Sequence, residues 1–212
     1  MMKTKIIKVT PEDIEIINEA AQIIKNGGIV AFPTETVYGL GADAFNEEAC
    51  NKIYEIKGRP SNKPLSLLVS DKDMIDSIAV ITPIAQRLID KFFPGSLTLI
   101  LNRNVSSNYA LSIMYYALTT VGVRMPNNEI ALSLIRATGN PIAAPSANLS
   151  GQAPPTNAYD VLETFNGKIP LIIDGGVCEF GISSTIVDLT GESPIILRHG
   201  AISDDDIFNA IK

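Results

Sequence analysis

Basic and hydroxyl-bearing residues recur in turns that follow apolar segments of this 212-residue chain. The first group is Lys57-Gly-Arg59, and the second is Ser146-Ala-Asn148. The chain is acidic overall, with 23 Asp and Glu against 17 Lys and Arg. Because a cation removed from water must be paired, basic residues in the turns of such a protein indicate a bound anion. We expect this anion to be a nucleotide.

Arg124 lies in a segment that alternates as a β-strand does. Along residues 119–125, valines and Met125 occupy one face, while Thr120, Gly122 and Arg124 occupy the other. An arginine among apolar residues requires either an acidic partner or a ligand anion, and we favour the ligand.

Arg198 ends another apolar segment, residues 195–198. The period of two places Leu197 on one face of this strand and Arg198 on the other, together with Ile196. Two explanations stay open for its charge, namely a ligand anion or solvent at the edge of a sheet.

The remaining polar residues also have structural explanations. A solvated helix end, where cations complement the helix dipole, explains Lys57, Arg59 and Lys63 equally well. Ser146 and Asn148 are turn formers that bond their own backbone. Polar residues at strand ends are nevertheless where ligands bind in open α/β sheets. Thr34 and Thr36 occupy such a position after the first buried strand. Ser184 opens another strand, and two explanations stay open for it, namely a donor to a ligand or a cap of the strand edge.

Several common functional motifs do not fit this sequence. Residues 39–44 match the G-x-G-x-x-G/A dinucleotide pattern, but the strand before them ends too early, at Phe32. The sequence contains no P-loop, and its single histidine, His199, has no G-x-S-x-G serine to activate. With Cys50 and Cys178 far apart, a protein metal site is not expected either. The chemistry must therefore use positioned cations and hydroxyls.

The segments around these residues alternate between strands and helices. Strands are predicted at residues 29–32, 65–69, 97–101, 119–125, 142–144, 171–173, 185–189 and 195–198. Helices are predicted from an N-cap at Thr10 to Gly27, from Asn46 to Gly58, from Thr82 to Pro94, over 128–138, and after a cap at Thr156. The pattern predicts one α/β domain over residues 1–212.

Composition and charge narrow the class of protein further. A hydrophobic content of 46% with only 6% aromatic residues indicates a core of aliphatic side chains, as in a sheet covered by helices. The net charge of -6 argues against a general nucleic-acid surface. Two cysteines, no signal sequence and no apolar run of membrane-spanning length predict a cytoplasmic protein.

Six blocks of the chain resemble the YrdC/Sua5 family, in family order from about residue 10 to residue 202. They are Phe32-Pro-Thr-Glu-Thr-Val-Tyr-Gly-Leu-Gly41, Lys57-Gly-Arg59-Pro60, Pro94-Gly-Ser-Leu-Thr98, Val123-Arg-Met-Pro126, Ala144-Pro-Ser-Ala-Asn-Leu-Ser150, and Asp174-Gly-Gly with Ser184-Thr185. The paired Lys-x-Arg and Ser-x-Asn signatures resemble those of the branch that makes L-threonylcarbamoyladenylate, the precursor of the t6A37 modification of tRNA.

The resemblance implies a single-domain α/β fold, with a twisted mixed sheet flanked by helices around a large cavity for ATP, L-threonine and bicarbonate or CO2. It implies that the nucleotide is held by Lys57, Arg59, Ser61, Thr120, Ser146, Asn148 and Arg198. It implies that threonine is held by Thr34, Arg124, Ala144 and Ser184. Lys57 and Arg59 are expected to balance phosphate charge during catalysis, and Mg²⁺ is expected mainly on the ATP phosphates.

The chain departs from the family's sequence pattern in two places, and two other functions stay open as alternatives to the synthase activity. Many relatives carry His in a Pro-Leu-Ile-Val-His run, where this chain has Pro64-Leu-Ser-Leu-Leu68. The chain also ends soon after Arg198, so we expect no C-terminal Sua5 domain. The rivals are an RNA-binding module and an enzyme that adenylates a different carbamoyl group. We expect the product to pass to the tRNA threonylcarbamoyl transferase machinery, with direct tRNA binding doubtful.

Overall fold

The computed structural model describes residues 3–105 and 119–212. These residues form one mixed sheet of ten strands, flanked by seven helices. The strands in sequence order are β1 (Lys5–Lys8), β2 (Val30–Phe32), β3 (Gly39–Asp43), β4 (Leu67–Leu68), β5 (Leu97–Asn102), β6 (Thr120–Arg124), β7 (Ile142–Ala143), β8 (Leu171–Asp174), β9 (Thr185–Asp188) and β10 (Ile195–Arg198). The helices are α1 (Ile14–Lys25), α2 (Glu47–Lys57), α3 (Lys72–Ile78), α4 (Pro83–Phe92), α6 (Glu129–Thr138), α7 (Ala158–Phe165) and α8 (Asp204–Ile211).

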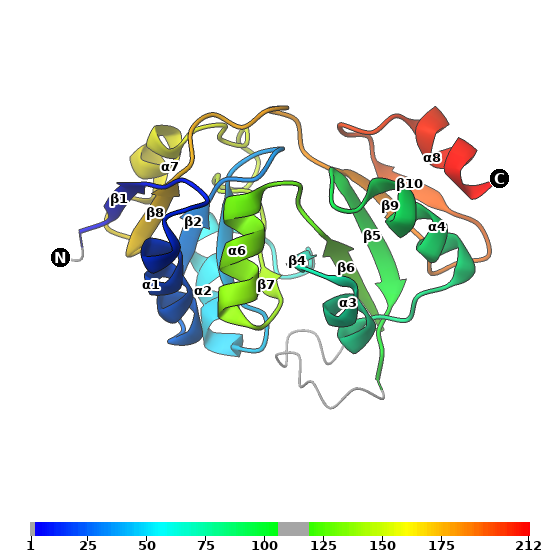
Figure 1. Cartoon of the computed structure of the whole chain (residues 1–212), viewed down its shortest axis with the longest axis horizontal. Coiled ribbons are helices and arrows are strands. Elements are labelled where there is room, and N and C mark those ends of the chain that lie inside the picture. Colours follow the sequence, from blue (N-terminus) through cyan, green and yellow to red (C-terminus); the bar gives the residue numbers. More distant parts are fainter. Residues whose placement is uncertain (1–2, 106–118) are drawn as a thin grey trace.

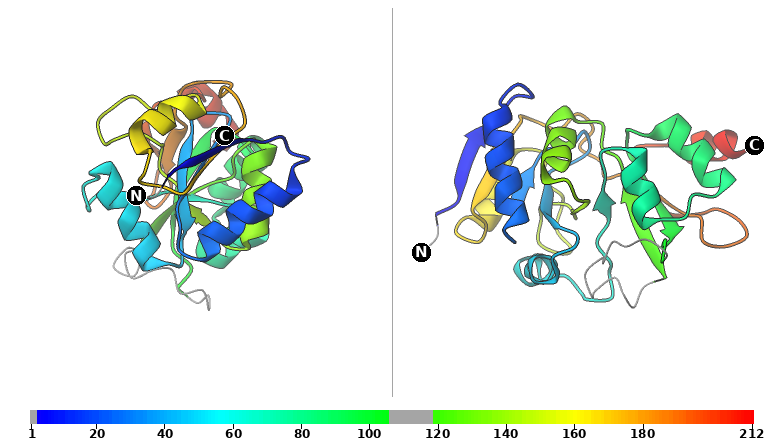
Figure 2. Two further views of the ribbon diagram at one scale, coloured as in Figure 1. Left: turned by 90° about the vertical axis from the view of Figure 1, so that its left-hand side faces the viewer. Right: turned by 60° about the horizontal axis from the view of Figure 1, so that its bottom comes forward.

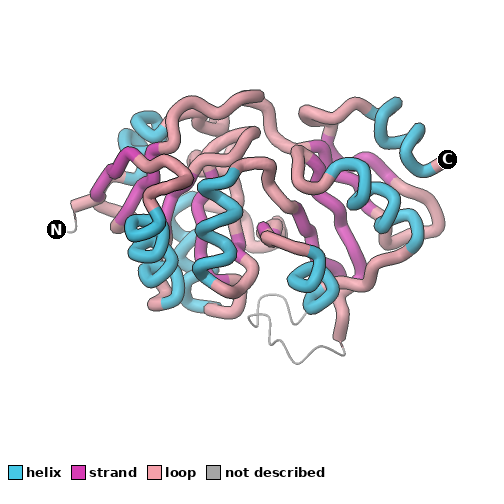
Figure 3. Tube along the Cα trace, in the orientation of Figure 1, coloured by secondary structure: helices cyan, strands magenta, loops and turns pink. Residues whose placement is uncertain are grey.

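The spatial order of the strands is β1-β8-β2-β3-β7-β4-β6-β5-β9-β10. In Figure 1 the longer strands gather toward the two ends of the sheet, and the short strands β7 and β4 join them near the middle. The tube in Figure 3 shows that long loops cross between the two ends along one side of the molecule. The predicted α/β class, with a mixed sheet between helices, is confirmed.

Helices cover both faces of the sheet at the end that carries the N-terminus. Helices α1 and α6 lie side by side on one face, and α2 and α7 lie on the other (Figure 2). Strand β2 shows why its sequence is apolar without a break. Val30 and Phe32 pack with α1 and α6, while Ala31 between them packs in the core on the opposite side.

At the other end, one face of β5, β6 and β9 packs against α3 and α4. The inward residues there include Leu97 and Leu99 of β5 and Val123 of β6, which share a core with Ile75 and Leu88 of these helices. The predicted alternation of residues 119–125 is therefore confirmed. The alternate residues point away from this core, and they face the pocket described below.

Most helix boundaries follow the capping signals in the sequence. The side chains of Asn46, Thr82 and Asn128 accept hydrogen bonds from the first turns of α2, α4 and α6. The predicted N-cap at Thr10 is wrong, because residues 10–13 form a turn in which the Asp13 carboxylate accepts hydrogen bonds from Thr10. The cap of α7 is likewise Asn157 and not the predicted Thr156.

Four elements were not predicted from the sequence, namely β1, β3, α3 and α8. Strand β3 contains the glycines of the dinucleotide-like pattern and pairs antiparallel with β2. A Cβ at Gly41 would lie 2.5 Å from Phe32 Cε1, so this glycine permits close strand packing. The geometry agrees with our rejection of a dinucleotide site. Among the described residues, no helix is long and apolar enough to cross a membrane.

Candidate active site

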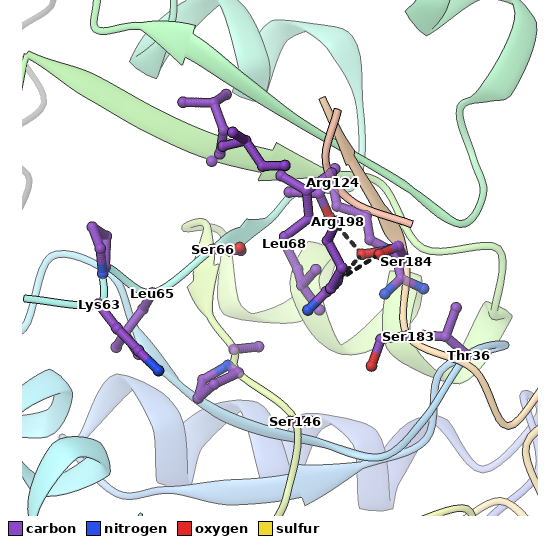
Figure 4. Close-up of a pocket in the computed structure, with 18 of the residues that line it drawn as sticks. Thr36, Lys63, Leu65, Ser66, Leu68, Arg124, Ser146, Ser183, Ser184 and Arg198 are labelled. Carbon is purple, nitrogen blue, oxygen red and sulfur yellow. Dashed lines mark hydrogen bonds between the residues drawn. The ribbon is translucent and has the colours of Figure 1, made fainter. Parts of the chain in front are cut away.

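A pocket of about 530 Å³ lies on the face of β5, β6 and β9 that is turned away from α3 and α4. Its size falls within the range of small-molecule binding sites, roughly 300–1,000 Å³. Its walls come from segments far apart in the sequence, including the loop after α2, the loop after β7 and strand β10. Figure 4 shows Arg124, Arg198, Ser184 and Ser146 around this one space. Tertiary folding thus gathers most of the motifs.

The floor of the pocket follows the strand register. Thr98 pairs with Ile186 across β5 and β9, and Ile100 pairs with Gly122 across β5 and β6. Gly122 allows Ile100 and Ser66 to pack closely over the strand, because a Cβ there would lie 3.1 Å from Ile100 Cδ1 and 3.3 Å from Ser66 Oγ. Thr120 lies farther along the same face of β6 and also lines the pocket.

Arg198 is held against Ser184 at one side of the pocket. Its Nε donates to Ser184 O, and its Nη2 donates to Ser184 Oγ, each at 2.9 Å (Figure 4). Ser184 Oγ also lies 2.8 Å from Thr98 Oγ1. Partial desolvation, together with the charges of Arg124 and Arg59, lowers the pKa of the Arg198 guanidinium. The side chain is thus fixed before any ligand binds.

The predicted facing of Arg198 is wrong in one respect. Simple alternation separates Leu197 from Arg198, but both residues line the pocket. The cause is an irregularity in the pairing of β10 with β9, where the register shifts between Ile196 and Arg198. Such a bulge turns neighbouring side chains to the same side.

Arg124 forms an ion pair with an acidic residue and also lines the pocket. Its Nη2 lies 2.7 Å from Glu35 Oε2, and its Nε donates to Gly95 O at 3.1 Å. The side chains of Arg124 and Glu35 are only 8% and 2% exposed. The sequence left an acid partner and a ligand anion as alternatives, and the structure supplies the acid while keeping Arg124 in the pocket wall.

Arg59 follows the end of α2 and shapes the next loop. Its Nε donates to Lys63 O at 2.9 Å and its Nη2 to Pro64 O at 2.8 Å. Tyr54 OH donates to the same carbonyl of Lys63, and its ring lies 6.0 Å from the guanidinium carbon of Arg59. Arg59 and Lys63 both line the pocket. This loop therefore presents positive charge to it.

Lys57, the last residue of α2, lies beneath the pocket wall and does not line it. It is only 3% exposed, so the alternative of a solvated helix end is wrong for this residue. Its Nζ donates to the backbone carbonyls of Ser146 and Asn148. Burial, and to a lesser degree the charge of Arg59, lowers the pKa of Lys57 to about 8. Lys57 thus ties α2 to the Ser146-Ala-Asn148 turn.

Ser146 and Asn148 bond to one another within that turn. Ser146 Oγ donates to Asn148 Oδ1 at 2.5 Å, and Asn148 Nδ2 donates to the carbonyls of Leu149 and Gln152. Ser146 lines the pocket and Asn148 lies behind it. The turn-forming role and a binding role are therefore compatible for Ser146.

The structure brings together seven of the eleven predicted site residues. The seven that line the pocket are Arg59, Thr120, Arg124, Ala144, Ser146, Ser184 and Arg198. Of the other four, Lys57 and Asn148 support the wall. Thr34 is buried and hydrogen-bonded to Thr36 and Val37, and Ser61 is exposed on the loop after α2.

Two acidic residues near the site were not singled out from the sequence. Glu35 pairs with Arg124, and Asp188 contributes the single carboxylate among the residues that line the pocket. Glu35 had one signal available, since it lies between Thr34 and Thr36 directly after a buried strand. A charge at such a position needs a partner.

Within residues 3–105 and 119–212, no three His, Cys, Asp or Glu side chains are grouped so as to hold a metal ion. The pocket instead offers cations and hydroxyls. This donor set suits a Mg²⁺ ion that arrives on phosphate oxygens and water, which is the usual state of Mg²⁺ with nucleotides.

The chain is similar to known proteins over nearly its whole length. The Sua5/YciO/YrdC family model, described as "Telomere recombination", matches residues 22–200. The "Threonylcarbamoyl-AMP synthase" of Pyrococcus abyssi is 46% identical over 193 residues, which are 91% of this chain and 56% of that protein. The protein of the same name from Bacillus subtilis is also 46% identical, over 90% of this chain and 55% of its own length. The solved structure described as P. abyssi Sua5 complexed with L-threonine superposes with a TM-score of 0.92 at 45% identity, covering 98% of this chain and 61% of that chain.

A mixed sheet with a cationic pocket on its open face, together with these matches, defines the class. The chain belongs to the Sua5/YciO/YrdC family. It spans a little over half the length of the two curated relatives described above.

Proposed function

We propose that this chain is an L-threonylcarbamoyladenylate synthase, a nucleotidyltransferase that forms threonylcarbamoyl-AMP and pyrophosphate from L-threonine, bicarbonate or CO2, and ATP. The observation that carries the proposal is the convergence of Arg124, Arg198, Ser184 and Ser146 on one pocket. The name shared by the relatives from P. abyssi and B. subtilis supports the same activity.

The two substrates divide the pocket between them in this proposal. Thr120, Ser146, Arg59 and Arg198 face the nucleotide. Arg124, the backbone of Ala144 and Ser184 face L-threonine. A relative whose structure is described as complexed with L-threonine supports threonine as the ligand. The positive guanidinium of Arg124 suits a carboxylate, to which its remaining nitrogen, Nη1, donates a charge-assisted hydrogen bond.

Four residues act from the edges of the pocket in this proposal. Lys57 and Asn148 hold the turn that carries Ser146, and Lys57 contributes positive charge from behind it. Thr34 contributes through the hydroxyl cluster that it forms with Thr36, and Thr36 itself lines the pocket. Ser61 belongs to the exposed loop beside Arg59, where it is available to a bound nucleotide.

The chemistry needs alignment and charge more than a protein nucleophile. The threonine amine adds to CO2 and releases a proton, which gives a carbamate. A carbamate oxygen then attacks the α-phosphorus of ATP, and the bond from that phosphorus to the oxygen of the β-phosphate breaks to release pyrophosphate. Lys57, Arg59 and Arg198 stabilise the charge that develops on the phosphates. Bound Mg²⁺ would supply further charge neutralisation from the phosphate oxygens.

Pyrophosphate release tests the proposal directly. The purified chain is incubated with ATP, Mg²⁺ and bicarbonate, with L-threonine, with L-serine or with no amino acid. We expect pyrophosphate release that depends on L-threonine and bicarbonate. We expect Arg124→Ala to lose this threonine-dependent release. Threonine-independent release, or release that Arg124→Ala leaves unchanged, would contradict the assignment.

The product would serve tRNA modification through a separate transferase. Threonylcarbamoyl-AMP is a mixed anhydride, so a downstream enzyme must transfer its threonylcarbamoyl group to N6 of adenosine 37, with release of AMP, to form t6A37. Direct tRNA binding is not part of the proposal, because the chain carries a net charge of -6.

A further inference from the structure

Glu35 lies directly behind the pocket, and the proposed chemistry gives it no substrate to touch. Glu35 is 3% exposed. One carboxylate oxygen, Oε2, lies 2.7 Å from Arg124 Nη2, and the other, Oε1, accepts a hydrogen bond from Ser96 Oγ at 3.0 Å. The backbone carbonyl of Glu35 accepts a further hydrogen bond from Phe180 N. The residue is therefore fixed at both its backbone and its side chain.

A buried ion pair of this kind is weak evidence for a stabilising role. Removing two charges from water costs several kcal/mol per ion, and their attraction often does no more than offset that cost. Apolar residues of similar volume are frequently as stable in such positions. The presence of Glu35 and Arg124 in a largely apolar interior is better explained by what Arg124 does in the pocket.

The contacts of Arg124 leave one nitrogen for a ligand. Its Nε donates a hydrogen bond to Gly95 O, and its Nη2 forms an ion pair with Glu35 Oε2 without hydrogen-bond geometry, so two of its three nitrogens are engaged from behind. Among the described residues, Nη1 makes no hydrogen bond or ion pair, and Arg124 lines the pocket. Arg198 is held in a comparable way by two bonds to Ser184. Both guanidiniums are thus oriented before substrate arrives.

We propose that Glu35 is a positioning residue, which acts through Arg124 to present its guanidinium to the carboxylate of the amino-acid substrate, and that Ser96 orients Glu35. This inference rests on the proposed function, because it takes the carboxylate of L-threonine as the ligand of Arg124. Glu35 itself does not touch the substrate.

A positioning role and a purely electrostatic role have opposite consequences. Glu35 is an anion behind Arg124, so it also competes with the substrate carboxylate for the same positive charge. If competition dominated, removal of the negative charge would tighten threonine binding. If positioning dominates, its removal frees the guanidinium to turn, and binding weakens.

Glu35→Gln separates the two roles, because it removes the charge and keeps the size of the side chain. We expect the KM for L-threonine to rise at least about tenfold, which is the scale of one well-oriented charged hydrogen bond, while the KM for ATP changes little. Calorimetric binding of L-threonine should weaken by a similar factor. In an Arg124→Ala background, Glu35→Gln should produce no further change in threonine binding.

The chain offers a matched control in an exposed glutamate–arginine pair. Glu129 lies 2.6 Å from Arg136 on α6, both side chains are about half exposed, and neither residue lines the pocket. Glu129→Gln should leave the threonine KM unchanged. Ser96→Ala provides a second variant that keeps both charges, and we expect a smaller increase in the threonine KM. If Glu35→Gln does not fold, the threonine KM of Ser96→Ala tests the positioning role of Glu35.

Three results would overturn the inference. Unchanged threonine binding in Glu35→Gln and in Ser96→Ala would leave Glu35 as a structural partner only. Tighter binding in Glu35→Gln would show that Glu35 competes with the substrate. An additive loss in the Arg124→Ala background would show that Glu35 does not act through Arg124. Failure of the wild-type chain to release pyrophosphate with L-threonine would instead refute the proposed function.

Discussion

The burial of Lys57 should make the free energy of unfolding depend on pH. The group is 3% exposed and its pKa falls from an ordinary value of 10.5 to about 8, chiefly through burial. In the pH range between these values, the unfolded chain holds a proton that the folded chain has released. The free energy of unfolding therefore rises with pH in that window. Below about pH 8 the ammonium is charged in both states, and the full cost of burying it is present.

The magnitude follows from the size of the pKa change. At about pH 9.5 the pH lies about 1.5 units above the pKa of Lys57 in the folded protein, whereas at about pH 7 the group is protonated in both states. At about 1.4 kcal/mol per unit, the free energy of unfolding should rise by about 2 kcal/mol between these pH values. Lys57→Met removes the titrating group and keeps most of the side-chain volume. The stability difference, wild type minus variant, should therefore increase by about 2 kcal/mol between these pH values.

Urea denaturation at the two pH values measures this difference. Lys52→Met, an exposed lysine of the same helix, serves as the control for loss of a lysine from α2. A difference that stays constant or falls with pH would refute the reasoning. It would mean that the hydrogen bonds to the carbonyls of Ser146 and Asn148 hold the proton on Lys57 against the effect of burial.

Three further predictions concern the pocket floor, a loop and a helix cap. Gly122→Ala should change the free energy of unfolding by less than about 1 kcal/mol, because Ile100 can move its end by a few tenths of an ångström. It should nevertheless raise the KM of both substrates, because the added methyl group displaces Ile100 and Ser66, which line the pocket. Wild-type KM values in steady-state assays of the variant would contradict this. Tyr38→Phe should cost about 1–3 kcal/mol in urea denaturation, since the hydroxyl bonds Gly176 O and Gly175 N, and Tyr54→Phe, which loses an exposed bond, should cost less. Asn46→Ala should cost about 1 kcal/mol by loss of the α2 cap, and a thermal unfolding midpoint equal to that of wild type would argue against it.

Local signals were sufficient for much of the fold. Capping residues such as Asn46, Thr82 and Asn128 bond to the adjacent helical turn, so the helix start that they mark can be predicted without tertiary information. The alternation of residues 119–125 correctly placed Thr120, Gly122 and Arg124 on one face. Strand β3 was missed because its sequence, Gly-Leu-Gly-Ala-Asp, is poor in the residues typical of strands and is held by its neighbours.

Errors arose where distant segments changed a local rule. The register shift in β10 depends on its pairing with β9, so alternation alone could not turn Arg198 to the side of Leu197. The error at Thr10 was local instead, because the nearby Asp13 side chain accepts hydrogen bonds from Thr10 and the helix begins after Asp13. Whether Arg124 has an acid partner depends on Glu35, 89 residues earlier in the chain.

The sequence by itself determined the α/β class, the family resemblance and the polar motifs that converge, because periodicity, caps and motif residues are local properties. Only the tertiary structure decided that Lys57 is buried behind the Ser146-Ala-Asn148 turn and that Glu35 stands behind Arg124. Burial and ion pairing depend on which distant segments the sheet brings into contact, and no spacing along the chain encodes that contact directly.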